Sequence, residues 1–272
     1  MVISIIALLM TIMMPGLSAA KDHVKNVMCQ ANLRQWSLVW KMFTDGNNGR
    51  FMSGGEVGGP DYTGPEIGGG YGGEGRASEG DHSWPLILWR HYGERKLLCC
   101  PRANKPPAMA AGDDRGEREF MRRGMLSTWG LWVNHPEDFI YGSYGVNSYI
   151  YDRGGTKDGF PYWRHIAQKR AERIPIMMDC FWCEGFPRHT NPPPEYPTIW
   201  IGDPSTYIQR FCVDRHRHTT NVLGFDLSVQ NTGLKGLWRL KWSPAFDTNG
   251  PWTSSYAPPP IWPDWMKPFK DY

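Results

Sequence analysis

The chain has 272 residues, of which 40% are hydrophobic, so it can bury a core in one domain or at most two. Its formal net charge is only +3, and no basic run is longer than Arg122-Arg123, which argues against nucleic acid as a partner. The 14 Trp, 31 Gly and 23 Pro predict an aromatic-rich domain with many turns.

Residues 1–20 carry no charge, and their only polar side chains are Ser4, Thr11 and Ser18. A helix of that length spans about 30 Å, the thickness of the hydrocarbon core of a bilayer. We expect a transmembrane segment here, and Pro15 is compatible with one because membrane helices tolerate a proline kink. Its apolar positions include Val2, Ile3, Ile5, Ile6, Leu8, Leu9, Ile12 and Leu17.

Residues 21–45 continue the helical pattern as an amphipathic segment. Apolar residues recur mostly at steps of three and four, which indicates one helical face: Val24, Val27, Met28, Ala31, Leu38, Val39, Met42 and Phe43. The pattern ends at the turn-forming residues 45–49. The sequence therefore predicts one helix over 1–45, half in a membrane and half packed on a domain formed by 46–272.

Other interpretations of this segment remain open. Ser18-Ala19-Ala20 resembles the small-residue cleavage site of a signal peptide, although no cationic region precedes the apolar run. A plain single-span anchor and a buried core helix are further alternatives.

The middle of the chain predicts loops around a short helix. Glycine dominates residues 46–81, which indicates a long surface loop. A short helix is expected over 84–92, followed by a turn and a strand that leads into Cys100-Pro101. Residues 102–123 predict a second loop excursion.

The remaining chain predicts a sheet. Residues 142–151 have the composition of a strand, and 173–182 indicate a buried strand, Ile174 to Met178, that ends at Asp179. Residues 221–233 predict a hairpin, and 233–242 a short helix before a surface tail. One long helix followed by antiparallel strands indicates an α+β fold.

Several of these stretches resemble a known family. The apolar run with VMCQANLRQWSLVWKMFTDGNNGRF resembles the N-terminal helix of type IV pilins and type II secretion pseudopilins. Cys100-Pro101, residues 143–147 (SYGVN) and Ile174-Pro175 with Asp179 are similar to the large pseudopilin-like proteins that end in a His-x9-Asp-Gly signature. His216 and Asp226 keep that spacing, whereas Leu227 stands at the position of the glycine. A glycine at that position would favour a tight turn.

The resemblance implies a pilin-like, non-enzymatic subunit of a type II secretion or type IV pilus-related filament. It implies a basic leader before Met1, cut by a prepilin peptidase and followed by N-terminal methylation. The expected location is the bacterial inner membrane, single-pass, with the domain in the periplasm or outside the cell. Expected partners are membrane lipid, an inner-membrane assembly platform, and copies of this chain and related pseudopilins.

Six cysteines fit an exported chain with disulfides, at Cys29, Cys99, Cys100, Cys180, Cys183 and Cys212. A bridge from Cys29 to Cys99 or Cys100 would tie the helix to the domain, and buried thiols are the alternative. Cys180-x-x-Cys183 with His216-x-His218 suggests zinc only weakly, because the histidine spacing is short. Asp179 and Asp226 are candidate calcium ligands. Otherwise no cofactor is expected.

No catalytic motif stands out. Gly-x-Ser-x-Gly and His-Glu-x-x-His are both missing from the sequence, so the chain is not expected to be an enzyme. A secreted enzyme with an unrecognised site is one alternative. Another is a membrane-tethered or secreted carbohydrate-binding protein that would stack sugars on exposed Trp238, Trp242, Trp252, Trp262 and Trp265.

Overall fold

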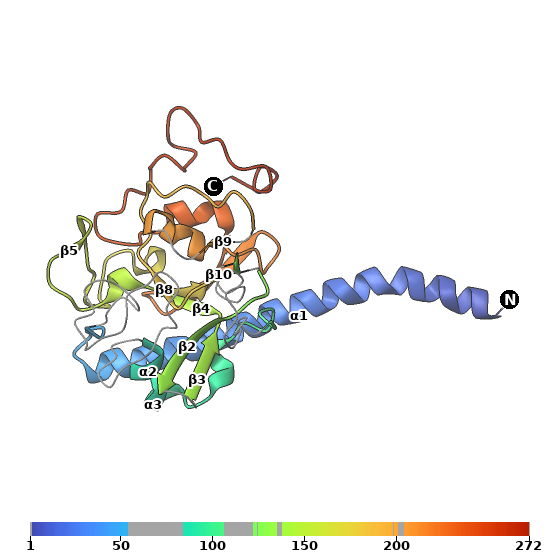
Figure 1. Ribbon diagram of the computed structural model, residues 1–272, viewed down its shortest axis with the longest axis horizontal. Helices are drawn as coiled ribbons and strands as arrows, with labels where there is room; N and C mark the ends of the chain where they lie inside the picture. The colour runs from blue at the N-terminus through green and yellow to red at the C-terminus, as the bar shows by residue number, and fades with distance from the viewer. Residues whose placement is uncertain are drawn as a thin grey trace.

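The fold, taken from a computed structural model, has a long N-terminal helix and a separate domain built around a mixed sheet (Figure 1). The structure describes residues 2–53, 84–105, 122–123, 125–134, 138–197, 199–200 and 204–271. Much of the glycine-rich stretch 46–81 and of the excursion 102–123 lies outside these residues. So do the side chains of the assembly-helix residues between Val2 and Leu9.

Helix α1 covers Val2–Gly46 and runs through Pro15 without interruption. It ends where Asn47 and Gly49 turn back and donate backbone hydrogen bonds to the Thr44 carbonyl, at 3.0 and 2.8 Å. The predicted helix over 1–45 is therefore confirmed. Its C-terminal half packs on the domain, while its N-terminal half projects away from it (Figure 1).

The face of α1 that packs on the domain overlaps the predicted one only in part, at Val39 and Phe43. The residues buried there follow steps of three and four from Cys29: Leu33, Trp36, Val39 and Trp40. Most of the predicted face is instead between 47% and 61% exposed, at Val24, Val27, Met28, Leu38 and Met42. Because apolar residues lie on both sides of this helix, spacing alone fits two faces. The face with the two tryptophans buries more area, and it is the one that packs.

The predicted single-pass location in an inner membrane is contradicted. Among the described residues, no helix is long and apolar enough to cross a membrane.

The central sheet has five strands in the order β11-β10-β7-β4-β8. Their bounds are Val229–Gly233, Thr219–Gly224, Pro175–Asp179, Tyr144–Asn147 and Glu184–Gly185. Neighbouring strands are antiparallel except β4 and β8, which are parallel, so the sheet is mixed. The α+β class is confirmed. Helix α1 packs against β10 and β11 at one side of the sheet.

Strand β7 is completely buried, as the sequence predicted, and it occupies the centre of the sheet. The strand predicted over 142–151 is shorter: β4 gives way to a 3₁₀ helix, η2 (Ser148–Ile150). Asn147 stops the strand because its side chain accepts a hydrogen bond from the Tyr149 amide and donates to the carbonyls of Pro175 and Trp242.

Short elements surround this sheet. The predicted helix over 84–92 forms as two pieces, α2 (Trp84–Ile87) and α3 (Trp89–Tyr92). The strand predicted before Cys100 is wrong, because residues Arg95–Leu98 form a 3₁₀ helix, η1. The other elements are β1 (Arg122–Arg123), β2 (Trp129–Asn134), β3 (Asp138–Gly142), β5 (Thr156–Lys157), β6 (Phe160–Pro161), η3 (Ala171–Arg173), β9 (Ile199–Trp200), η4 (Pro204–Arg210) and η5 (Leu234–Arg239).

The β10–β11 hairpin forms where it was predicted, with Leu227 in its turn. The Leu227 amide donates to the Gly224 carbonyl at 2.9 Å, and the Asp226 carboxylate accepts hydrogen bonds from the amide and hydroxyl of Ser228. To close the turn, Leu227 adopts a φ of 64°, in the left-handed region that glycine enters most easily.

Two of the five tryptophans predicted to bind sugars belong to the core. Trp238 and Trp242 are 1% and 0% exposed, and their indole nitrogens donate to backbone carbonyls. Trp252 and Trp262 pack on Trp238 with ring centroids 6.5 and 5.4 Å away. Trp265 donates to the Pro194 carbonyl. These residues hold the C-terminal tail against the domain.

Candidate functional site

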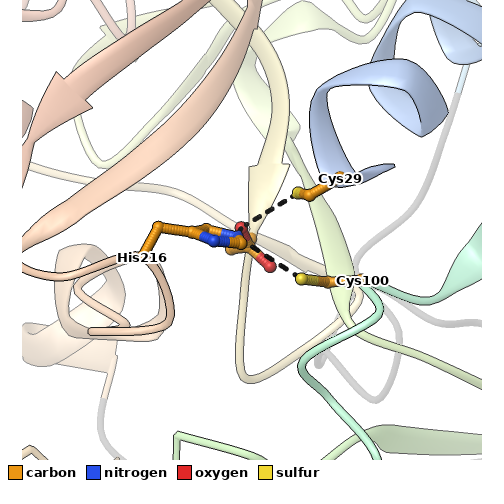
Figure 2. Close-up of side chains that lie close together, drawn as sticks. Cys29, Cys100 and His216 are labelled. Atoms are coloured by element: carbon orange, nitrogen blue, oxygen red, sulfur yellow. Dashed lines mark hydrogen bonds and ion pairs between the residues drawn. The ribbon is translucent and has the colours of Figure 1, made fainter. Parts of the chain in front are cut away.

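A buried polar cluster lies where α1 meets the sheet. Four side chains, from α1, the segment after η1, the end of β7 and the loop before β10, place one donor atom each within 4.8 Å of all the others: Cys29, Cys100, Asp179 and His216. It is the only such group of potential metal ligands among the described residues. Figure 2 shows Cys29, Cys100 and His216 pointing toward one another from separate segments.

The helix contributes Cys29, which is 0% exposed. It is the first of the buried positions on the packed face of α1, so the packing that buries Trp36 also fixes the thiol against the sheet. The Tyr144 hydroxyl donates a hydrogen bond to Cys29 Sγ at 3.2 Å. The Cys29 thiol in turn lies 3.6 Å from Asp179 Oδ2.

Asp179 is the last residue of β7 and pairs with Tyr144 of β4 in the antiparallel register. Its side chain is completely buried and receives a hydrogen bond at Oδ1 from Arg215 Nη1, at 2.9 Å. Arg215 is also buried, and it donates further hydrogen bonds to the carbonyls of Ser143, Met125 and Ser127. Oδ1 is therefore used for structure, and Oδ2 faces the other members of the cluster.

Cys100 is positioned by backbone contacts at the end of η1. Its amide donates to the Ser143 hydroxyl at 2.7 Å, and the Ser143 amide donates to the Leu98 carbonyl at 2.9 Å. These bonds attach the segment to the start of β4. Cys100 Sγ consequently lies 3.4 Å from His216 Nε2.

His216 enters the cluster from a tight loop. Arg217 and His218 both adopt positive φ, 54° and 69°, and the His218 amide donates to Asp214 Oδ1 at 2.6 Å. This reversal turns the His216 ring inward, where its Nε2 atom is 3.1 Å from Asp179 Oδ2. His216 Nδ1 is buried and has no hydrogen-bond partner among the described residues.

The cluster is electrostatically coupled. Burial would raise the pKa of Asp179, but the charges and hydrogen bonds of His216 and Arg215 outweigh it and hold this pKa at about 2. Burial would lower the pKa of His216, whereas Asp179 and Cys100 raise it to about 10. Burial raises the pKa of Cys29 well above its usual value. For Cys100, hydrogen bonds from Cys29 and His216 overcome the effect of burial and lower the pKa to about 7.

The arrangement does not fit nucleophilic catalysis. A Cys-His-Asp relay uses both ring nitrogens, one for the nucleophile and the other for the carboxylate. Here Cys100 and Asp179 both face Nε2 of His216. The side chains of Asp179 and His216 are also 0% exposed, so the cluster does not present a nucleophile to a substrate.

The donor types suit a metal better. Thiolate sulfur, imidazole nitrogen and carboxylate oxygen are the ligands that zinc and similar divalent ions take in proteins. Each of the four residues offers one such atom, and these atoms all lie within 4.8 Å of one another.

The sequence singled out all four residues but did not bring them together. Cys29 and Cys100 were candidates for a disulfide, and the structure places their thiols in one cluster, not linked to each other. Cys180 and Cys183 do not join His216, and neither does exposed His218, which pairs with Asp214. Cys99 and Cys212 also lie outside the cluster.

The two calcium candidates are separated. The register pairs Gly224 of β10 with Pro175, at the start of β7, so the turn that holds Asp226 lies at the opposite end of β7 from Asp179. Asp226 instead stabilises the hairpin turn. Neither Arg215 nor Tyr144 was among the site residues expected from the sequence, although Tyr144 lies in the SYGVN stretch. The sequence shows an arginine directly before the signature histidine, but nothing in the sequence indicates that it is buried.

Comparisons of the chain with protein-family models, with curated proteins and with solved structures gave no match.

Proposed function

We propose that this chain is a structural, non-enzymatic subunit of a pseudopilin-like filament of the type II secretion or type IV pilus kind. Copies assemble through the projecting half of α1. The observation that supports this proposal is that the projecting half of α1 is apolar and is exposed to solvent in the single chain.

The exposure is concentrated between residues 10 and 17. Five large apolar side chains there are each between 57% and 70% exposed: Met10, Ile12, Met13, Met14 and Leu17. Isolated apolar residues are common on protein surfaces, but a contiguous apolar helix is not, and such surfaces mark interaction sites. A helix that is apolar on every side is normally buried among other elements.

The same helix in another copy is a suitable cover. Identical apolar helices that pack together bury the exposed side chains of every copy at once, and the charged residues Lys21 and Asp22 set a limit to the apolar zone. The domains would then lie outside the packed helices. The resemblance of residues 2–45 to a pilin helix supports the same arrangement.

The test compares assembly of the full chain with that of two charge variants, Ile12→Asp and Leu17→Asp, in detergent-free buffer. An unpaired carboxylate in an apolar interface is costly, so each variant should raise the concentration needed for assembly by more than about tenfold. Sedimentation velocity measures the assembly, and electron microscopy shows whether it is filamentous.

Ile261→Asp is the matched control, because Ile261 is 85% exposed but lies in the C-terminal tail. It should assemble as the unmodified chain does. Wild-type protein that stays monomeric at high concentration, or helix variants that assemble as readily as the control, would refute the proposal.

A further inference from the structure

We propose that Cys29, Cys100, Asp179 and His216 form a binding site for a thiophilic divalent cation, with Zn²⁺ as the best fit. The site is structural: it ties α1 to the sheet at their shared interface. This inference is independent of filament assembly.

Three of the distances between donor atoms lie close to those of tetrahedral coordination. Zn²⁺ binds sulfur at about 2.3 Å and nitrogen or oxygen at about 2.0–2.2 Å, so a tetrahedral ion separates its donors by about 3.3–3.8 Å. Cys100 Sγ is 3.4 Å from His216 Nε2, and that nitrogen is 3.1 Å from Asp179 Oδ2. Cys29 Sγ is 3.6 Å from the same Oδ2 atom. All remaining pairs lie within 4.8 Å.

Hydrogen bonding alone leaves this arrangement poorly explained. His216 Nε2 carries at most one hydrogen, yet it faces both Cys100 Sγ and Asp179 Oδ2. Asp179 Oδ2, which can accept two hydrogen bonds, faces the ring and the Cys29 thiol. Four donor atoms of these types within 4.8 Å of one another are expected of ligands around an ion.

The charges also balance. Two thiolates, one carboxylate and a neutral imidazole around Zn²⁺ give a net charge of about −1. The buried guanidinium of Arg215, 2.9 Å from Asp179 Oδ1, compensates that charge. Balance matters here because an uncompensated charge is costly in a buried, low-dielectric site.

Neighbouring groups hold the ligands in place, as outer-shell partners do in metal sites. Arg215 occupies Asp179 Oδ1 and leaves Oδ2 for the ion. The Tyr144 hydroxyl donates to Cys29 Sγ, and Ser143 fixes the Cys100 backbone. Four protein ligands in a buried position leave no open coordination site, which is typical of structural rather than catalytic zinc.

The experiment measures metal bound to the purified full chain after equilibration with Zn²⁺ and removal of excess ion. We expect about one Zn²⁺ per chain, in line with one four-ligand site. Cys29→Ser and Cys100→Ser should each lower the zinc affinity by at least about tenfold, as loss of a ligand does. Cys99→Ser is the matched control: Cys99 is the neighbouring residue in the sequence, but its thiol donates to the Tyr141 carbonyl outside the cluster.

Cobalt provides a readout that does not depend on the folding of variants. Co²⁺ bound to the unmodified chain should give thiolate-to-metal charge transfer and the intense visible bands of a tetrahedral ion, and Zn²⁺ should displace them. A chelator should lower the melting temperature of the unmodified chain, and added Zn²⁺ should restore it.

The proposal is wrong if the unmodified chain binds no zinc, if its cobalt spectrum lacks thiolate bands, or if Cys29→Ser binds zinc as tightly as Cys99→Ser. A chain mass two hydrogens lower, with Cys29 and Cys100 joined in one disulfide, would also overturn it. Zinc should bind equally well to the assembly-deficient Ile12→Asp variant. Failure of either proposal is therefore distinguishable from failure of the other.

Discussion

Arg215 Nη1 donates a hydrogen bond to Asp179 Oδ1 at 2.9 Å, and neither side chain is exposed to solvent. The guanidinium also binds the carbonyls of Met125, Ser127 and Ser143. One arginine therefore neutralises the buried carboxylate and attaches two further segments of chain to the sheet.

Removal of this arginine should be severely destabilising. Arg215→Ala leaves the Asp179 carboxylate buried without its partner, and we expect a loss of about 3–5 kcal/mol in the free energy of unfolding. Urea denaturation measures the loss. The control is Arg217→Ala, because Arg217 is 63% exposed and pairs with Asp22 only at 3.7 Å, so its loss should cost less than about 1 kcal/mol. Equal costs for the two variants would contradict this view of the pair.

The packed face of α1 can be tested with two substitutions on different sides of the helix, at Trp36 and Leu38. Trp36 is 0% exposed, and its indole nitrogen donates to the Leu97 carbonyl at 2.8 Å. Its ring meets that of Trp84 edge-on, with the ring centroids 5.2 Å apart. Trp36→Ala should cost about 3–5 kcal/mol through the cavity it leaves. Leu38→Ala, at a position 61% exposed, should cost less than about 0.5 kcal/mol in the monomer. Chemical denaturation measures the loss in the free energy of unfolding for each variant. A larger loss for Leu38→Ala than for Trp36→Ala would favour the face predicted from spacing.

The turn of the β10–β11 hairpin should invert the usual ranking of alanine and glycine. Within regular elements glycine is the less stable residue, but Leu227 adopts a φ of 64°, where a Cβ atom is unfavourable. Leu227→Gly should therefore be more stable than Leu227→Ala by about 1 kcal/mol. Both variants lose the leucine side chain, so their difference isolates the backbone. Greater thermal stability of the alanine variant would rule out the left-handed turn.

Asp152 should give the fold a pH-dependent contribution. Its carboxylate accepts hydrogen bonds from Arg164 at 2.6 Å and Arg50 at 3.0 Å, and these arginines lower its pKa below the ordinary 3.8 despite the opposing effect of burial. A group whose pKa is lowered by folding stabilises the fold above its unfolded pKa. That stability is lost as the pH falls through the lower, folded value.

The comparison is between the unmodified chain and Asp152→Asn, with melting temperatures recorded from about pH 7 to about pH 3. The unmodified chain should be more stable near neutral pH, and its advantage should shrink once the pH falls below 3.8. The effect should be small, because both arginines are about half exposed. An advantage that stays constant over this range would exclude Asp152 as its source.

The sequence predicted those parts of the fold that depend on local signals. The extent of α1, strand β7 and the β10–β11 hairpin were all marked by periodicity, by an apolar run or by turn formers. The packed face of α1 was not, because Leu38 and Trp36 are both apolar and only the segments that pack on the helix, α2, α3 and η1 in the case of Trp36, decide which is covered. The predicted location is contradicted, because no helix in the described part of the chain is long and apolar enough to cross a membrane.

The cluster could not be assembled from the sequence for a related reason. Its ligands come from four separated segments, and metal motifs are recognisable only when two ligands are a few residues apart. That bias favoured Cys180-x-x-Cys183, whereas Cys29 and Cys100 meet only through tertiary packing. His216 and Asp179 were noted, but as a family signature and a calcium candidate. The pairing of β10 with β7 brings the loop that holds His216 next to Asp179 at the end of β7.

The uninterrupted course of α1 makes it a rigid rod. Its 45 residues extend about 68 Å at 1.5 Å per residue, and each residue turns the helix by about 100°. Because the domain is fixed to the C-terminal half, deletion of one residue between the exposed apolar zone and Cys29 would swing the domain around the rod by about 100° relative to the tip. In the proposed filament, the length of this segment, more than its composition, would set the angle at which each copy displays its domain.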